Sequence, residues 1–162
     1  MAKRSRVETE LTVNQILDEA FKQILTIGFE AMSYTTLSAA TGVSRTGISH
    51  HFPRKTEFLV RLDQRIGAFF IEGLDFTSIT ALERSWREVM RHPERKAVLQ
   101  LFFCLCASTD ENMKTFKSLD IVREAAVSHF AEVGCQCVEQ LIGNSALVLL
   151  QDGQLHQEQV TH

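Results

Sequence analysis

The sequence predicts an all-α protein, with a three-helix unit at the N-terminus and a short helical body behind it. Apolar residues recur at spacings of three and four along most of the chain, which places them on one face of successive helices. Sustained alternation of apolar and polar residues, the pattern of a half-buried strand, is absent from the sequence. Glycine or proline separates several of the periodic segments and indicates where helices end.

The composition narrows the class of protein. Hydrophobic residues make up 44% of the 162 residues, which is enough for a buried core. The chain has no run of 18 apolar residues, so no transmembrane helix is predicted. The basic residues at the start are not followed by the apolar stretch of a secretion signal. We therefore expect a cytoplasmic protein whose four cysteines are free thiols.

The first predicted helix covers residues 12–27. Thr12 and Gln15 have the spacing of a capping box, and Leu11 has the place of the hydrophobic staple that often accompanies one. Gly28 follows the helix at the position where a left-handed residue commonly ends it. One face of this helix carries Val13, Ile16, Leu17, Ala20, Phe21, Ile24 and Leu25.

Two short helices are predicted next, over about 36–41 and 45–50. A hydroxyl residue precedes each of them and can cap its first amide groups. A glycine breaks the first helix, and a proline ends the second because the residue before proline avoids the helical region. These residues are Thr35 or Thr36, Gly42, Ser44 and Pro53.

A long helix over residues 55–74 and three weaker helical segments make up the rest. The long helix carries Phe58, Leu59, Leu62, Ile66, Phe69 and Phe70 along one stripe. The weaker segments are one around Leu82–Met90 that stops near Pro93, one over 97–105, and one over 120–142 that stops near Gly143. Residues 146–150 are predicted as a helix or a strand, and 151–162 as a loose polar tail.

The two short helices and the glycine turn between them, at about 35–52, predict a helix-turn-helix. Its inner face is supplied by Leu37, Val43, Ile48 and Phe52. The outer face of the second helix should then present Arg45, Thr46, Gly47, Ser49 and His50, which are short or cationic, as a helix entering the DNA major groove requires.

The residues on this outer face have separate expected roles. Arg45 is the best candidate for a base edge, because a guanidinium pairs bidentately with guanine. Thr46 has a methyl group that suits contact with thymine. Gly47 costs about 1 kcal/mol in a helix relative to alanine, and a close approach of the helix backbone to DNA would explain it.

Residues 12–75 resemble the N-terminal domain of TetR-family regulators. The matching residues, in order and spacing, are Thr35-Thr36-Leu37, Thr41-Gly42-Val43-Ser44, Gly47-Ile48, His51-Phe52-Pro53 and Lys55. The resemblance implies a homodimeric repressor whose partner is a double-stranded DNA operator. It places near phosphates or bases Thr35, Thr36, Ser44, Arg45, Thr46, Gly47, Ser49, His50, His51 and Lys55. Ser49 stands where the family has a phosphate-contacting tyrosine, and its hydroxyl has a shorter reach.

The resemblance divides the chain into three parts. Residues 1–54 form an N-terminal arm and the DNA-binding domain, 55–75 the connecting helix, and 76–162 a C-terminal helical domain for dimerisation and possible ligand binding. Charge is unevenly distributed when the chain is divided after Arg65, since residues 1–65 carry 9 Lys and Arg against 7 Asp and Glu, or +2, and the remainder 8 against 13, or −5. The basic residues Lys3, Arg4 and Arg6 are either a DNA-binding arm or a simple tail.

The C-terminal part offers a candidate dimer helix and a candidate pocket. The 120–142 helix carries small and apolar residues on one side, which suits a helix pair between two subunits, or else packing on its own core. These residues are Ala125, Ala126, Ser128, Phe130 and Val133. A pocket for a small apolar inducer would be lined by Phe69, Phe70, Trp86, Met90, Phe102, Phe103, Met113 and Phe116, which are equally the types that fill a core.

The cysteines suggest an alternative signal to which the regulator could respond. Two Cys-x-Cys units, at 104/106 and 135/137, could sense oxidants or bind a thiophilic metal. Residues two apart on a helix point about 200° apart, so one unit cannot hold one ion, and buried inert thiols are the default. No metal, cofactor or enzymatic activity is predicted, because no catalytic motif is present. A helical interaction module without a DNA role is the remaining alternative.

Overall fold

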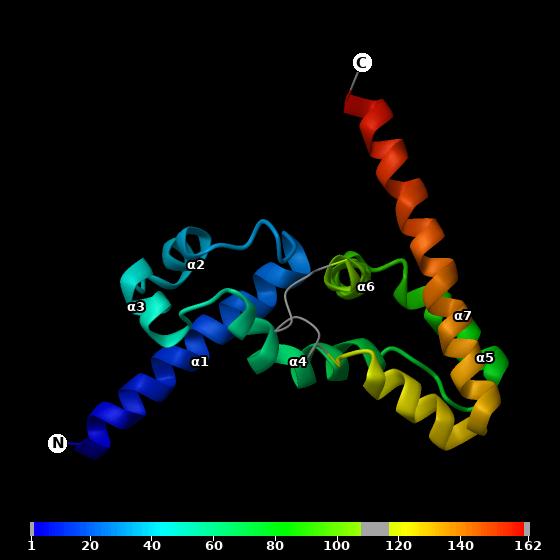
Figure 1. The fold of residues 1–162 in the computed structure, drawn as a ribbon, viewed down its shortest axis with the longest axis horizontal. Helices are drawn as coiled ribbons and strands as arrows, with labels where there is room; N and C mark the ends of the chain where they lie inside the picture. Colours follow the sequence, from blue (N-terminus) through cyan, green and yellow to red (C-terminus); the bar gives the residue numbers. More distant parts are fainter. Residues whose placement is uncertain (1, 108–116, 161–162) are drawn as a thin grey trace.

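The computed structural model describes residues 2–107 and 117–160, with side chains for 6–107 and 117–151. These residues form seven helices and no strand, which confirms the predicted fold class (Figure 1). The helices are α1 (Ala2–Thr26), α2 (Tyr34–Thr41), α3 (Arg45–His51), α4 (Thr56–Ile71), α5 (Ile79–Val89), α6 (Pro93–Cys106) and α7 (Asp120–Val160).

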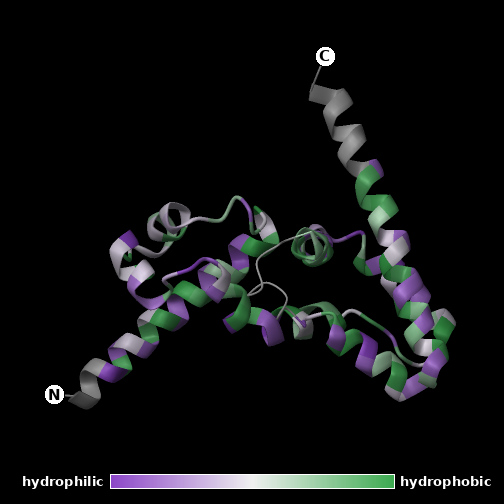
Figure 2. Cartoon of the chain, viewed as in Figure 1, coloured by the Kyte–Doolittle hydropathy of each residue, from purple (hydrophilic) through white to green (hydrophobic). Residues whose placement is uncertain are grey.

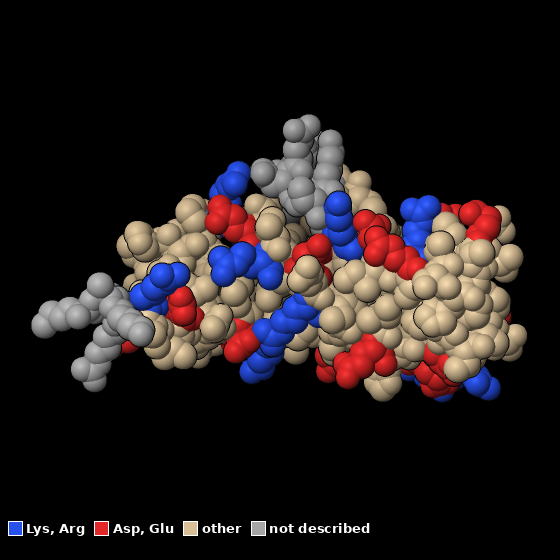
Figure 3. Space-filling view, turned by 90° about the horizontal axis from the view of Figure 1, so that it is seen from below, with Lys and Arg blue, Asp and Glu red and all other residues tan. Residues whose placement is uncertain are grey.

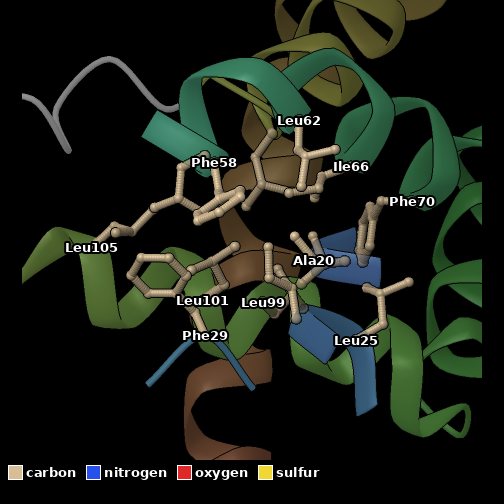
Figure 4. Close-up of a cluster of buried hydrophobic side chains, with 14 of the residues drawn as sticks. Ala20, Leu25, Phe29, Phe58, Leu62, Ile66, Phe70, Leu99, Leu101 and Leu105 are labelled. Carbon is tan, nitrogen blue, oxygen red and sulfur yellow. The ribbon is translucent and has the colours of Figure 1, made fainter. Parts of the chain in front are cut away.

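One apolar core joins the N-terminal helices to the body. Helix α1 packs against α2, α4 and α6, and α4 also packs against α6 and α7. Figure 4 shows side chains of α1, α4 and α6 meeting in this core, with Phe29 of the α1–α2 loop at its edge. Because α4 shares its apolar face with both parts, the three-helix unit and the body fold around a continuous core.

Helix α1 begins ten residues earlier than the sequence pattern predicted. Thr12 lies inside the helix, where its hydroxyl donates to the Glu8 carbonyl at 3.0 Å, and Gln15 donates to the Thr41 carbonyl at 3.0 Å. Leu11 is 63% exposed. The predicted capping box and staple are therefore wrong, because these side chains have other partners. Gly28 does end the helix, with a φ of 85°.

Two other predicted helix ends are wrong. The predicted end of α5 near Pro93 is confirmed, since α5 ends at Val89. Pro93 itself is the first residue of α6, a position where the helix makes no hydrogen bond to the backbone N–H that proline lacks. Helix α4 ends at Ile71, three residues before the predicted end. Gly143 lies within α7, and residues 146–160 continue that helix instead of forming a strand or a loose tail.

Helix α7 consists of two arms that meet at a sharp bend. Ala131 has a φ of 52° and a ψ of −140°, so the backbone leaves the helical region there. The two arms cross closely, since a Cβ added at Gly134 would lie 2.2 Å from the Ala126 carbonyl oxygen. The second arm extends past the rest of the protein toward the C-terminus (Figure 1).

Replacing Ala131 with glycine should raise the free energy of unfolding by about 1 kcal/mol. A Cβ is disfavoured at this positive φ, and glycine carries none. Urea denaturation would measure the change. The matched control is Ala68→Gly at an exposed, regular position of α4, which should lose about 1 kcal/mol. Equal losses in both variants would contradict a strained Ala131.

Figure 2 shows polar and apolar residues mixed along the second arm of α7, and apolar residues predominate over 146–150. Among the side chains of α7 that the structure describes, the large apolar ones that are exposed are Val127, Val133, Leu147, Val148 and Leu150. By length and composition, residues Asp120–Gln151 are apolar enough to cross a membrane, although the sequence has no apolar run of 18 residues. The bend at Ala131 divides this stretch, and α7 contacts α4, α5 and α6.

Candidate nucleic-acid interface

The first helix of the helix-turn-helix is held by a capping box, and the residue that caps it is not the one predicted from the sequence. Ser33, and not Thr35 or Thr36, caps α2, because its side-chain oxygen accepts from the Thr36 backbone N–H at 3.1 Å. The Thr36 hydroxyl in turn accepts from the Ser33 backbone N–H at 2.9 Å. It also lies 2.6 Å from Gln23 Oε1, so the box ties α2 to α1.

The turn and the start of α3 have the predicted geometry. Gly42 has a φ of 74°, in the left-handed region that glycine favours, and its N–H donates to the Ser38 carbonyl. Ser44 caps α3, as predicted, and accepts from the Gly47 backbone N–H at 3.1 Å. These local bonds fix where α3 begins and therefore which side chains it presents.

Phe52 and Tyr34 fix the far end of α3. The Phe52 ring is buried and stacks on Phe58 of α4, with ring centroids 4.4 Å apart. The Tyr34 hydroxyl donates to the Phe52 carbonyl at 2.7 Å, and burial raises the pKa of this phenol. The role of Tyr34 was not predictable from the sequence, because its partner is 18 residues away and no local pattern indicates the bond.

The outward face of α3 carries the predicted DNA-contacting side chains. Arg45, Thr46 and His50 are exposed, and Ser49 is half-buried. The Ser49 hydroxyl donates to the Thr46 carbonyl at 3.1 Å, while His51 lies beside His50 with ring centroids 5.4 Å apart. The structure thus brings a guanidinium, hydroxyls and an imidazole onto one short helix, a set that suits base edges and phosphates.

Packing inside the motif, in addition to the predicted approach to DNA, explains why residue 47 is a glycine. A Cβ added there would lie 3.2 Å from both the Ser44 hydroxyl oxygen and a Val43 methyl group, which is tighter than ordinary contact. Any larger side chain would therefore press on the cap and the turn of the motif.

The candidates outside α3 differ in accessibility. Thr35 is exposed at the start of α2, whereas the Thr36 hydroxyl is engaged in the capping box. Lys55 precedes α4, and its ammonium donates to the Glu30 carbonyl at 3.0 Å and lies over the Phe29 ring. Burial lowers the pKa of Lys55. Phosphate contacts by Thr36 and Lys55 remain predictions, and they compete with these internal bonds.

Charge alone does not single out an interface. On the face shown in Figure 3, Lys and Arg alternate with Asp and Glu. Several basic residues of the N-terminal part pair with acids, such as Arg65 with Asp18 and Arg54 with Glu57. The interface is therefore identified by the geometry of the helix-turn-helix.

The predicted pocket residues are divided among several places. Phe70 and Trp86 are buried, and their rings lie edge to face with centroids 5.3 Å apart, so they belong to the core. Trp86 and Met90 also line an open groove of about 460 Å³ between α5, α6 and α7. The other described members are Phe69, which contacts Phe21, and the neighbours Phe102 and Phe103. Met113 and Phe116 lie outside the described residues.

The four cysteines are free thiols. Cys104 donates to the Glu30 carboxylate at 3.4 Å, and burial, together with that carboxylate, raises the pKa of the thiol. Cys135 is buried and accepts from Arg123 Nε at 3.1 Å. Among the described residues, no group of three His, Cys, Asp or Glu side chains could hold a metal ion.

Two protein families match this chain. Residues 16–62 match the family described as bacterial regulatory proteins, tetR family. Residues 63–149, more than half of the chain, match the tetracycline repressor LuxT C-terminal domain. The first match contains the helix-turn-helix, and the second contains the body and most of the bent helix α7. No curated protein matches the chain.

Proposed function

The chain belongs to the TetR family of DNA-binding transcriptional regulators, and from this premise we propose that it is a ligand-responsive repressor that binds a palindromic operator as a homodimer. Members of this family are generally not enzymes. The single observation that carries the proposal is α3, which is capped at both ends and exposes Arg45, Thr46 and His50 together. A cytoplasmic location, where it would meet DNA, goes with this function.

The apolar face of α7 supports a homodimer. Val133, Leu147 and Leu150 are each more than 60% exposed, and apolar side chains clustered on one helix favour burial against a partner. A second α7 offers the same face, and a two-fold pair of helices is a common dimer interface. The sequence predicted this interface over 120–142, on both sides of the bend, and the exposed residues extend it along the second arm to Leu150.

A ligand would act by changing the separation of the two recognition helices. A dimer reads half-sites about 34–36 Å apart, so a body conformation that alters this distance releases the operator. The groove beside Trp86 and Met90 is the candidate place for a small apolar inducer. A thiol-responsive input through Cys104 is a second candidate because this thiol lies on α6 next to Glu30 of the DNA-binding domain. Its raised pKa disfavours it, since the thiolate is the reactive form.

Selection of binding sites from a random DNA library tests the proposal. Purified protein at moderate salt should enrich a palindrome with two half-sites, and size-exclusion chromatography with light scattering should give a dimer. A folded dimer that enriches no sequence would argue against operator recognition and favour an interaction module without a DNA role.

Replacing Arg45 with alanine should weaken binding to the selected operator by about 1–3 kcal/mol, or about 5- to 150-fold. The guanidinium is exposed at the start of α3, where it suits a bidentate bond to guanine. Fluorescence anisotropy with operator and scrambled duplexes would measure the change. Arg84→Ala, an exposed arginine on α5, is the matched control and should bind as the wild type does. Unchanged affinity in Arg45→Ala would exclude Arg45 from base recognition.

A further inference from the structure

The groove between α5, α6 and α7 combines an apolar part with a group of cations. It is lined by residues 86–91 at and after the end of α5, by Lys96 of α6, and by residues between 141 and 148 in the second arm of α7. Figure 1 shows that arm beside α5, which it contacts. The volume of about 460 Å³ lies within the range of sites that bind small organic molecules.

The apolar part of the groove consists of Trp86, Met90, Leu141 and Val148. The Trp86 side chain is 2% exposed, and its indole N–H donates to the Ser145 hydroxyl at 2.9 Å. Ser145 donates in turn to the Leu141 carbonyl at 2.8 Å. Because the indole and the hydroxyl already have partners inside the protein, this part offers a ligand apolar surface, and burial of hydrocarbon against it is favourable.

The charged side chains of the groove are all cations. They are Arg87, Arg91 and Lys96, and none of the described residues that line the groove is an aspartate or a glutamate. Arg87 lies 3.7 Å from Glu83, and both side chains are exposed to solvent. Arg91 lies 3.3 Å from Glu88 in a pair that is also exposed. Exposed ion pairs are weak, so a bound carboxylate or phosphate can compete for these guanidiniums, which bind such anions in bidentate fashion.

The groove stays open in the proposed dimer. Successive residues of a helix are about 100° apart, so Leu141, Ser145 and Val148 lie within about 60° of one another on one face of α7. Leu147 and Leu150, which belong to the proposed dimer face, lie more than about 100° from the centre of that face. The second arm therefore has one face for the groove and another for the partner, and a ligand and a second subunit can bind together.

We propose that this groove binds a free amphipathic anion, with an apolar chain or ring on Trp86 and Met90 and a carboxylate or phosphate at Arg87 and Arg91. The inference rests on the proposed function and deepens it, because it gives the inducer of that proposal a charge as well as an apolar part. An uncharged inducer would reduce the hydration of nearby cations without pairing them, which costs free energy. An anion replaces the lost hydration with ion pairs, so its charge contributes to selection.

Three probes with ten-carbon chains and different charges test the inference: decanoate, decan-1-ol and decyltrimethylammonium. Each would be titrated into the full chain, below the concentration at which it forms micelles, and followed by tryptophan fluorescence and isothermal titration calorimetry. Trp86 is the only tryptophan, so a change in emission reports on the groove. Arg91→Glu reverses one cation at an exposed position. Arg84→Glu, an exposed arginine of α5 that does not line the groove, is the matched control.

We expect decanoate to bind the wild type saturably and more tightly than decyltrimethylammonium does. Arg91→Glu should weaken decanoate binding about tenfold and leave decan-1-ol binding within about twofold of the wild type, because only the anion interacts with the guanidinium. Arg84→Glu should bind all three probes as the wild type does. Circular dichroism and light scattering would establish that both variants are folded and have the oligomeric state of the wild type.

An equal loss of decanoate and decan-1-ol binding in Arg91→Glu would overturn the inference, as would a wild type that binds the three probes equally or binds none of them. These results would leave operator recognition standing, because DNA selection tests it without a ligand. Fluorescence anisotropy of the selected operator with decanoate present separates the two claims further. Decanoate that binds in the groove without changing operator affinity would support the site and overturn the ligand response of the proposed function.

Discussion

Replacing Phe52 with alanine is expected to lower the free energy of unfolding by about 3–5 kcal/mol, the range for removing a large aromatic side chain from a core. Phe52 is 1% exposed and stacks on Phe58 with the ring planes 24° apart. Its removal leaves a cavity between α3 and α4 and takes away the apolar anchor of the recognition helix. Operator binding should fall as well, because the far end of α3 would no longer be fixed.

Denaturant unfolding followed by circular dichroism would measure the loss. Leu11→Ala is the control, because Leu11 is 63% exposed and its truncation should change stability by no more than about 0.5 kcal/mol. Phe52→Leu keeps part of the buried volume and should fall between the two. A loss below about 1 kcal/mol in Phe52→Ala would contradict the packing described for this ring.

Replacing Gly134 with alanine is expected to destabilise the protein by about 3 kcal/mol, the upper part of the range for overpacking. The added Cβ would lie 2.2 Å from the Ala126 carbonyl oxygen and 2.7 Å from its carbonyl carbon. These are backbone atoms of the other arm of α7 and cannot rotate away as a side chain does. The two arms would have to separate, which should also weaken a dimer built on the second arm.

Gly143 provides the matched control within the same helix. A Cβ there would have nothing within 4 Å, so Gly143→Ala should stabilise the protein by about 0.5–1 kcal/mol through the helix propensity of alanine. Thermal unfolding and light scattering would compare the two variants. If Gly134→Ala were also stabilised, the arms of α7 would not cross where the structure places them.

The local chemistry of the recognition motif was predictable from the sequence. Gly42 with its positive φ and Ser44 with its hydroxyl cap act on backbone groups within three or four residues, so their effect is visible in the sequence itself. The exposed face of α3 followed from the burial of Ile48 and Phe52. The all-α class followed equally from apolar spacing, which is a property of each helix alone.

Partners distant in sequence were not predictable in the same way. The bond from Tyr34 to Phe52, the internal partners of Lys55 and the hydrogen bonds from Ser118 and Arg95 to carbonyls of α4 span 18 to 55 residues. The predicted ends of α1 and α7 were wrong for a related reason. Glycine often ends a helix, yet α7 continues through Gly143. Conversely, Ala131, a good helix former, lies at the bend.

The sequence by itself determined the helices, the turn between α2 and α3 and the side chains that α3 exposes, because hydrogen bonds and apolar periodicity act over a few residues. Only the tertiary structure decided where α7 turns back, which glycines allow backbones to meet and how α4 is tied to the body. These features depend on packing between segments far apart in the chain, and packing against a neighbour outweighs a local propensity of about 1 kcal/mol or less.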